Sequence, residues 1–429
     1  MMNVPGAIEQ ESSPASKVCR IAFCLYVIFM LVGSSMPFQD ADPNDEMTAS
    51  NPINQVVDSV IPLVCLVCLW PKRRKALDIL SEEKYLVLFL AWCAVTVIWS
   101  ESPFSSLKAC VRVIGSTIVA LAFFVNARSP EEAFKYIKGV LAVYIPLSFL
   151  AIAFVPGATQ WEWPAWRGLA RHKNTLGEIG LVSAIVWTFR IRQASAKGRL
   201  WCSLFGVASL VLVLGSKSTT ALLTLFFISF VALCFAAARW VGPALTTAAA
   251  GCCCVIGVLV LVNVAGSEEM FAGLGKDSTF TGRTDLWEAM IDEAKGHPFL
   301  GGGFGGFWTA DRDLRLESPE ESTWRPTEGH EGYLDLLNET GVVGVFLMAL
   351  MVIFYFRNAA RSRDHSNLWK SLFISVLIVN TMESTLFRLN SFTGWVFVLS
   401  YLALYAGLSQ EKERTAALQL QSPSTARAA

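Results

Sequence analysis

The sequence predicts an all-α, polytopic integral membrane protein with about twelve transmembrane helices. Of its 429 residues, 53% are hydrophobic and only 16% are charged, whereas about 25% of residues are charged in soluble domains. The apolar residues fall in blocks of about 15 to 24, separated by short polar stretches, and a helix of about 20 apolar residues is long enough to cross a bilayer. A soluble enzyme is therefore excluded.

Each apolar block predicts one span. In chain order the predicted spans are 18–36, 53–70, 85–100, 109–125, 139–156, 175–190, 200–215, 219–238, 240–263, 341–357, 368–385 and 392–408. We interpret the first block as a retained anchor, because it is long for the apolar region of a signal peptide. The basic residues gather on one side, as in 72–75 and 357–363. Because cytoplasmic loops collect Lys and Arg, both termini are predicted to be inside.

The domain organisation follows from one loop that is much longer than the others. Its 77 residues face outside, and such a long connection is usually functional or disordered. Aromatic residues and the helical spacing of apolar positions in 283–295 favour an ordered subdomain. The expected regions are a nine-helix transmembrane region (1–263), the outer loop subdomain (264–340), a three-helix transmembrane region (341–408) and a cytoplasmic tail (409–429).

Several classes of ligand are not expected. Lys+Arg and Asp+Glu both number 35 and form no clustered basic face, so the sequence predicts no nucleic-acid partner. The acidic run 311–321 lacks a recognisable coordination spacing, so we expect no metal and no cofactor. The glycine run 301–306 contains GxGxxG without the strand that a dinucleotide site needs. These glycines more simply predict a tight turn close to a neighbouring segment.

Three outer positions could carry chemistry. Arg283 opens the amphipathic helix 283–295, where its charge and the free N–H groups together suit a phosphate. His330 lies at the membrane edge before the tenth span and could take a proton from an alcohol. Lys217 stands among hydroxyls at the outer mouth between two spans. The simpler alternatives are a surface ion pair, an interfacial histidine without a chemical role, and a snorkelling lysine.

The outer loop before the sixth span adds further candidates. It has three tryptophans, which are ordinary membrane-interface anchors, beside Arg171 and Lys173, which could hold phosphate. Within the apolar blocks, charged side chains are costly unless they are paired or wet, and each is a candidate for lining a cavity. These residues are Asp58, Arg112, Glu178 and Glu383.

The order of these segments resembles the O-antigen ligase and exopolysaccharide polymerase superfamily. The segments that carry the resemblance are GRTDLW, HPFLGGGFGGF and GHEGYLDLLNETGVVG in the long outer loop, and RHKNTLGE, which is similar to the ExoQ-like polymerase branch. The resemblance implies a diphosphate-binding role for Lys217 and Arg283, with His330 as the catalytic residue. The chain departs from the family pattern in two places, with Lys217 where arginine is common and Glu331 where asparagine is usual.

The resemblance implies a metal-independent, inverting membrane glycosyltransferase. Its donor would be a glycan on a polyprenyl diphosphate, its acceptor a saccharide, and its active face the periplasmic side of the bacterial inner membrane. His330 would act as base, and Arg283, Lys217, Arg171 and Lys173 would hold the diphosphate. Supporting or acceptor-binding roles are expected for Glu331, Tyr333, His172, Asn174 and Glu383.

Other functions stay open. Within the class, an O-antigen ligase acting on lipid A core differs from a polymerase only in its acceptor, and RHKN favours the polymerase. A secondary transporter or lipid-linked glycan flippase would also have many spans, but it is expected to show two related halves and ionisable groups near the midplane. A non-catalytic scaffold would not bring Arg283 and His330 together.

Overall fold

The computed structural model describes residues 13–32, 52–160, 165–241, 279–309, 328–362, 366–388 and 391–421. Within these ranges the side chains of 52, 160, 231–232, 234–241, 279–285 and 420–421 are also outside the description. Residues 242–263 of the predicted span 240–263, and the acidic run 311–321, lie outside the described residues.

The described chain is almost entirely helical. Its α-helices are α2 (Pro14–Val32), α4 (Pro52–Leu69), α5 (Arg73–Glu82), α6 (Lys84–Thr96), α7 (Pro103–Asn126), α8 (Ala133–Phe154), α9 (Lys173–Ile191), α10 (Ala196–Ser216), α11 (Thr219–Val241), α14 (Thr279–Gly296), α16 (Gly332–Arg361), α17 (Asn367–Val379) and α18 (Phe392–Gln421). Two short strands, β1 (Thr159–Gln160) and β2 (Ala165–Trp166), pair antiparallel, with Thr159 opposite Trp166.

Seven helical segments in the described ranges are long and apolar enough to cross a membrane. They are Pro14–Val32, Ile53–Glu82, Pro103–Asn126, Pro130–Phe154, Ala196–Ser216, Gly332–Arg361 and Phe392–Gln419. Shorter apolar helices are Lys84–Trp99, Thr219–Phe230 and Asn367–Val379. The prediction of an all-α polytopic membrane protein is confirmed, while the number of twelve spans stays a prediction.

Helices α7 and α18 form the centre of the bundle. Their most apolar windows are 78% and 89% buried, compared with 28% for α10, so α7 and α18 contact protein on most sides. Tyr355 of α16, Phe373 of α17 and Phe397 of α18 stack in one aromatic column. On α10 the exposed apolar residues include Leu200, Leu204 and Leu214, and this surface suits contact with hydrocarbon.

The glycine run packs against a kink in α16. Gly341 interrupts that helix with φ 66°, and the Val342 amide donates to the carbonyl of Pro298 at 2.8 Å. The amide of Gly302 donates to Asn338 O at 2.7 Å. A Cβ atom at Gly341 would collide with the backbone of Phe299, so only glycine permits this approach. The predicted tight turn beside a neighbouring segment is confirmed.

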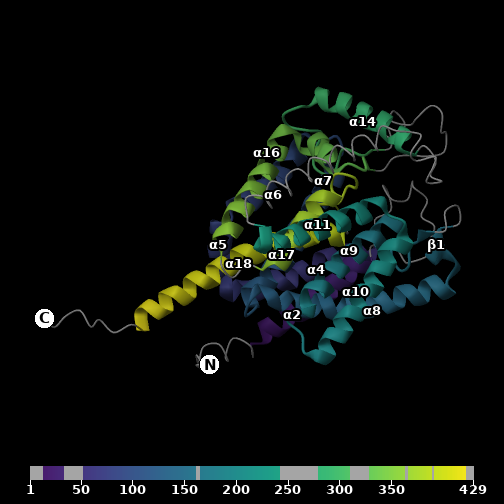
Figure 1. Ribbon diagram of the computed structural model, residues 1–429. Coiled ribbons are helices and arrows are strands. Elements are labelled where there is room, and N and C mark those ends of the chain that lie inside the picture. Colours follow the sequence, from purple (N-terminus) through teal and green to yellow (C-terminus); the bar gives the residue numbers. More distant parts are fainter. Residues whose placement is uncertain are drawn as a thin grey trace.

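Helix α14 covers the start of α16 at one end of the molecule (Figure 1). Its Leu286 and Met290 are buried and pack with Leu334 of α16. The indole Nε1 of Trp287 donates to the carbonyl of Gly329 at 2.8 Å. The predicted amphipathic helix 283–295 is therefore confirmed, and it touches the residue that precedes His330.

Candidate active site

His330 is presented by a short loop that leads into α16. Its backbone lies in the left-handed region with φ 48°, which is uncommon for a residue other than glycine. The following residue, Glu331, is the N-cap of α16, and its carboxylate accepts from the amide of Leu334. The Gly332 amide donates to Asn380 O at 2.9 Å, which fixes the loop against the end of α17. The loop that carries His330 is thus fixed to the start of α16 and to the end of α17.

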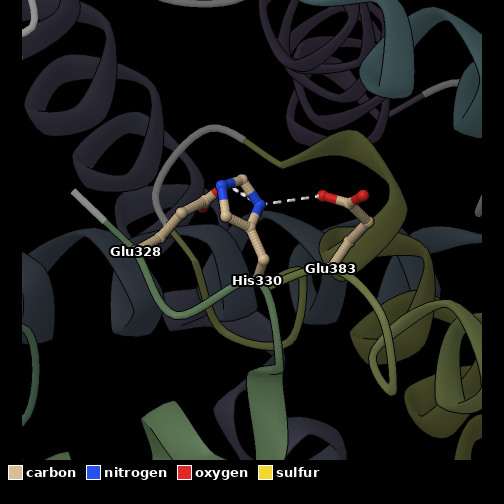
Figure 2. A group of neighbouring side chains, drawn as sticks. All are labelled: Glu328, His330 and Glu383. Carbon is tan, nitrogen blue, oxygen red and sulfur yellow. Dashed lines mark hydrogen bonds and ion pairs between the residues drawn. The ribbon is translucent and has the colours of Figure 1, made fainter. Parts of the chain in front are cut away.

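Two carboxylates face the same nitrogen of His330. Its Nδ1 lies 3.3 Å from Oε1 of Glu328 and 3.4 Å from Oε2 of Glu383. Figure 2 shows the imidazole between the two acids, with Glu328 on the same strand of loop and Glu383 coming from the segment between α17 and α18. A proton on Nδ1 can therefore be donated to either carboxylate.

The N-terminus of α9 reaches the same cluster. The side-chain amide Nδ2 of Asn174 donates to Oε1 of Glu383 at 2.6 Å. The segment RHKN therefore contacts His330 through the Glu383 carboxylate. His172 is the N-cap of α9, and its Nδ1 accepts from the backbone amide of Asn174 at 3.3 Å. Burial lowers the pKa of Arg171, and the neighbouring Glu328 carboxylate opposes that shift. The predicted basic loop and the predicted histidine therefore lie together.

Two of the expected supporting residues, Glu331 and Tyr333, make contacts that stabilise α16. Glu331 caps α16, and burial raises the pKa of its carboxyl to about 7. Tyr333 donates from its hydroxyl to the carbonyl of Leu377 at 2.8 Å, tying α16 to α17. Glu383, rather than the residue after the histidine, faces the imidazole.

A buried ionic network holds the loop from below. Arg388 pairs through Nη2 with Asp335 at 2.8 Å and through Nη1 with Glu339 at 2.7 Å. Asp335 also accepts from the amide of Gly329, from the indole of Trp308 at 3.0 Å and from a serine hydroxyl. Burial opposes the charge on Arg388, but the two carboxylates outweigh it and raise its pKa. This network fixes Gly329 and thereby the direction of His330.

Three predicted cations remain, and the first of them, Lys173, is the half-buried first residue of α9. Lys217 is the C-cap of α10 in a left-handed conformation with φ 51°, and its side chain is exposed. A Cβ atom on Gly177 of α9 would meet Ser216 and Ser218, so the Lys217 loop lies against α9 close to its N-terminus. Arg283 belongs to α14, but its side chain lies outside the described residues.

Sequence reasoning missed three residues of this region. Glu328 stands two positions before His330, and a carboxylate so close to a candidate histidine was the available signal. Arg388 has the appearance of an ordinary basic residue in a short outer loop, and Asp335 that of a polar position on an amphipathic helix. The two of them are joined only by tertiary contact.

The intramembrane charges noted in the sequence have partners. Arg112 of α7 pairs with Asp58 of α4 at 2.9 Å. Glu178 is buried on α9, where it interacts with Thr393 and Glu383. Burial also raises the pKa of Glu328, which His330 opposes and Glu383 reinforces. The His330 cluster thus holds several acids in a small volume. Within the described residues, Glu328, His330 and Glu383 each offer a potential metal-ligand atom within 4.8 Å of the other two.

Two comparisons with known proteins bear on the family that the chain resembles. Residues 204–349 match the family model described as O-antigen ligase. The chain is also 25% identical over 294 residues to the exopolysaccharide production protein ExoQ of Rhizobium meliloti (strain 1021), covering 65% of this chain. The resemblance to the O-antigen ligase superfamily is confirmed. The chain spans 66% of that relative's length, a little under two thirds.

The O-antigen ligase match contains Lys217, Arg283 and His330 but ends before Glu383 and Arg388. It also begins after Asn174. Two of the side chains that surround His330 therefore come from outside the part of the chain that matches the O-antigen ligase model. Only the folded arrangement brings these parts together.

Proposed function

We propose that this protein is a membrane glycosyltransferase that moves a saccharide from a polyprenyl diphosphate onto an acceptor glycan. The observation that carries the proposal is the contact chain from Asn174 through Glu383 to Nδ1 of His330. It joins RHKN and the histidine motif, two segments on which the family resemblance rests. A carboxylate that is itself held by an amide can orient an imidazole and stabilise its protonated form.

His330 acts as the general base in this proposal. With Nδ1–H directed at Glu383, Nε2 accepts the proton of the acceptor hydroxyl as that oxygen attacks the anomeric carbon. A bond forms between the acceptor oxygen and the sugar, and the bond from the sugar to the diphosphate breaks. The polyprenyl diphosphate leaves with the bonding electrons. Attack opposite the leaving group inverts the anomeric centre.

Cationic side chains compensate for the charge of the leaving diphosphate. Arg171 is half-buried beside Glu328, and the Lys217 loop packs on α9 near the same end. Together with Lys173 and Arg283, these residues would supply the positive charge. A cation about 4 Å from a phosphate oxygen contributes roughly 4 kcal/mol at an effective dielectric of 20, before desolvation. Arg388 is excluded from this role because Asp335 and Glu339 already neutralise it.

A polymerase is favoured over an O-antigen ligase. The support is RHKN, whose Asn174 contacts the cluster, and a relative whose name refers to exopolysaccharide production. A polymerase would transfer to another lipid-linked repeat unit, and a ligase to a sugar of lipid A core. A transporter is less well supported, because the polar groups gather where loops meet helix ends rather than at a midplane.

The family resemblance implies a bacterial inner membrane, and the distribution of basic residues favours an active face in the periplasm. The cluster lies at loops that the positive-inside rule assigns to the outside, namely those after α8 and α17 and before α16. A lipid-linked donor exposed on the periplasmic leaflet would reach it without crossing the membrane.

The test is transfer by the purified protein in liposomes that contain a polyprenyl-diphosphate-linked donor. We expect His330→Ala to fold, as judged by its melting temperature, and to lose transfer, because no other base replaces the imidazole. Full activity of that variant would refute the assignment. The donor KM should rise in Lys217→Ala and stay near wild type in Lys217→Arg, and an unchanged KM in Lys217→Ala would contradict a phosphate role.

A further inference from the structure

The cluster in Figure 2 places two carboxylate oxygens beside one imidazole nitrogen. A charge-assisted hydrogen bond between nitrogen and a carboxylate oxygen is usually about 2.7 to 2.9 Å long. Here both carboxylate oxygens stand farther away, at 3.3 and 3.4 Å from the same nitrogen. Neither acid has approached to a strong hydrogen-bonding distance.

These separations match those between ligands of one tetrahedral ion. Bonds of about 2.0 to 2.1 Å to nitrogen and oxygen at a tetrahedral angle place neighbouring ligand atoms about 3.3 to 3.4 Å apart. The remaining distance among the three ligand atoms, from the Glu328 oxygen to the Glu383 oxygen, is at most 4.8 Å. Glu383 is buried, whereas the Glu328 side chain is 37% exposed, so its rotation can shorten this distance.

The surroundings are those of a supported metal ligand set. The Asn174 amide holds the second oxygen of Glu383 at 2.6 Å, as outer partners hold metal-binding carboxylates. A site of two carboxylates and one histidine leaves a fourth tetrahedral position for water. Nitrogen and oxygen donors of this kind suit Zn²⁺ and similar divalent transition-metal ions.

We propose that Glu328, His330 and Glu383 form a binding site for a divalent transition-metal ion such as Zn²⁺, which takes the place of the proton on Nδ1. Binding by itself is independent of the proposed function. One consequence of binding rests on the proposed function. A metal at Nδ1 keeps the proton on Nε2, so His330 can no longer accept a proton from a hydroxyl. Zn²⁺ therefore inhibits transfer to the extent that the site is filled.

The test titrates Zn²⁺ alone into the chelator-treated full-length protein in detergent, by isothermal calorimetry. We expect one saturable site, whose affinity falls at least about tenfold in Glu328→Gln and in Glu383→Gln. Glu331→Gln is the matched control, because that carboxylate lies in the same loop but caps α16. Its affinity should equal that of the wild type. Equal melting temperatures show that the variants are folded.

Cobalt distinguishes this site from the eleven cysteines of the chain. Co²⁺ bound by His330 and the two glutamates absorbs weakly in the visible range and lacks the intense near-ultraviolet band of thiolate ligation. Absence of a saturable site, a thiolate band, or affinity unchanged in both glutamate variants would overturn the proposal. If Zn²⁺ binds as expected without slowing transfer, the metal site stands and the assignment of His330 as base fails. If transfer needs His330 but Zn²⁺ does not bind, the assignment of His330 as base stands and the metal site fails.

Discussion

Glu383→Gln gives the sharpest measure of how the imidazole is activated. Oε2 of Glu383 is 3.4 Å from Nδ1 of His330, and the carboxylate is buried. Coulomb's law gives about 1 kcal/mol for this pair in a water-like medium and about 5 kcal/mol at an effective dielectric of 20. In the proposed mechanism, this energy favours the imidazolium that forms as the acceptor loses its proton. The substitution removes the charge while keeping the shape.

The expected result is a fall in kcat of roughly 10- to 1000-fold, because about 1.4 kcal/mol corresponds to a factor of ten in rate. The donor KM should change little, since Glu383 holds the histidine and not the diphosphate. The assay is initial-rate transfer in proteoliposomes over a range of donor concentrations. Glu288→Gln, at an exposed carboxylate of α14, is the control and should retain nearly the wild-type kcat. A wild-type kcat in Glu383→Gln, or an effect confined to KM, would refute the reasoning.

Three further predictions concern stability, each measured by unfolding in detergent. Arg388→Met should lower the free energy of unfolding by about 3 to 5 kcal/mol, because two buried carboxylates lose their cation; a loss below about 1 kcal/mol would contradict the network. Gly341→Ala should lower the free energy of unfolding by about 1 to 3 kcal/mol or more, because φ is 66° and there is no room for a Cβ atom. A wild-type free energy of unfolding would show that the turn accommodates alanine. Burial raises the pKa of Glu83 from 4.5 to about 7, so the wild type loses up to about 3 kcal/mol as pH rises through 4.5 to 7; Glu83→Gln should remove that decline, and parallel profiles would refute it.

The helices could be predicted because hydropathy is a local property. The apolar blocks that fall in the described ranges coincide with helices, and 283–295 and 329–341 carry their apolar residues at helical spacing. The boundaries are less well predicted. Helix α18 continues to Gln421, well beyond the predicted end at 408, because polar helix propensity extends it after the apolar face ends.

The site could be predicted only in part. The sequence singles out Arg171 and His330 as a basic residue and a histidine in predicted outer loops, and Asn174 through the RHKN segment. The pairing of Arg388 with Glu339 spans 49 residues of sequence and that with Asp335 spans 53, and both depend on the path of the chain between α17 and α18. The spacing of apolar and polar residues along the sequence does not predict such a long-range contact. The position of Glu383 beside His330 has the same origin.

The spacing of acids on α16 explains how a diphosphate site could tolerate so many carboxylates nearby. Asp335 and Glu339 are four residues apart and lie on one face of the helix, where Arg388 neutralises both. Without that arginine, their charge would repel an anionic donor. Glu328 and Glu383 are directed instead at the imidazole, whose protonation they favour. The positive charge that a donor needs must then come from outside this set, and the basic outer loops beside α9 and α10 are placed to supply it.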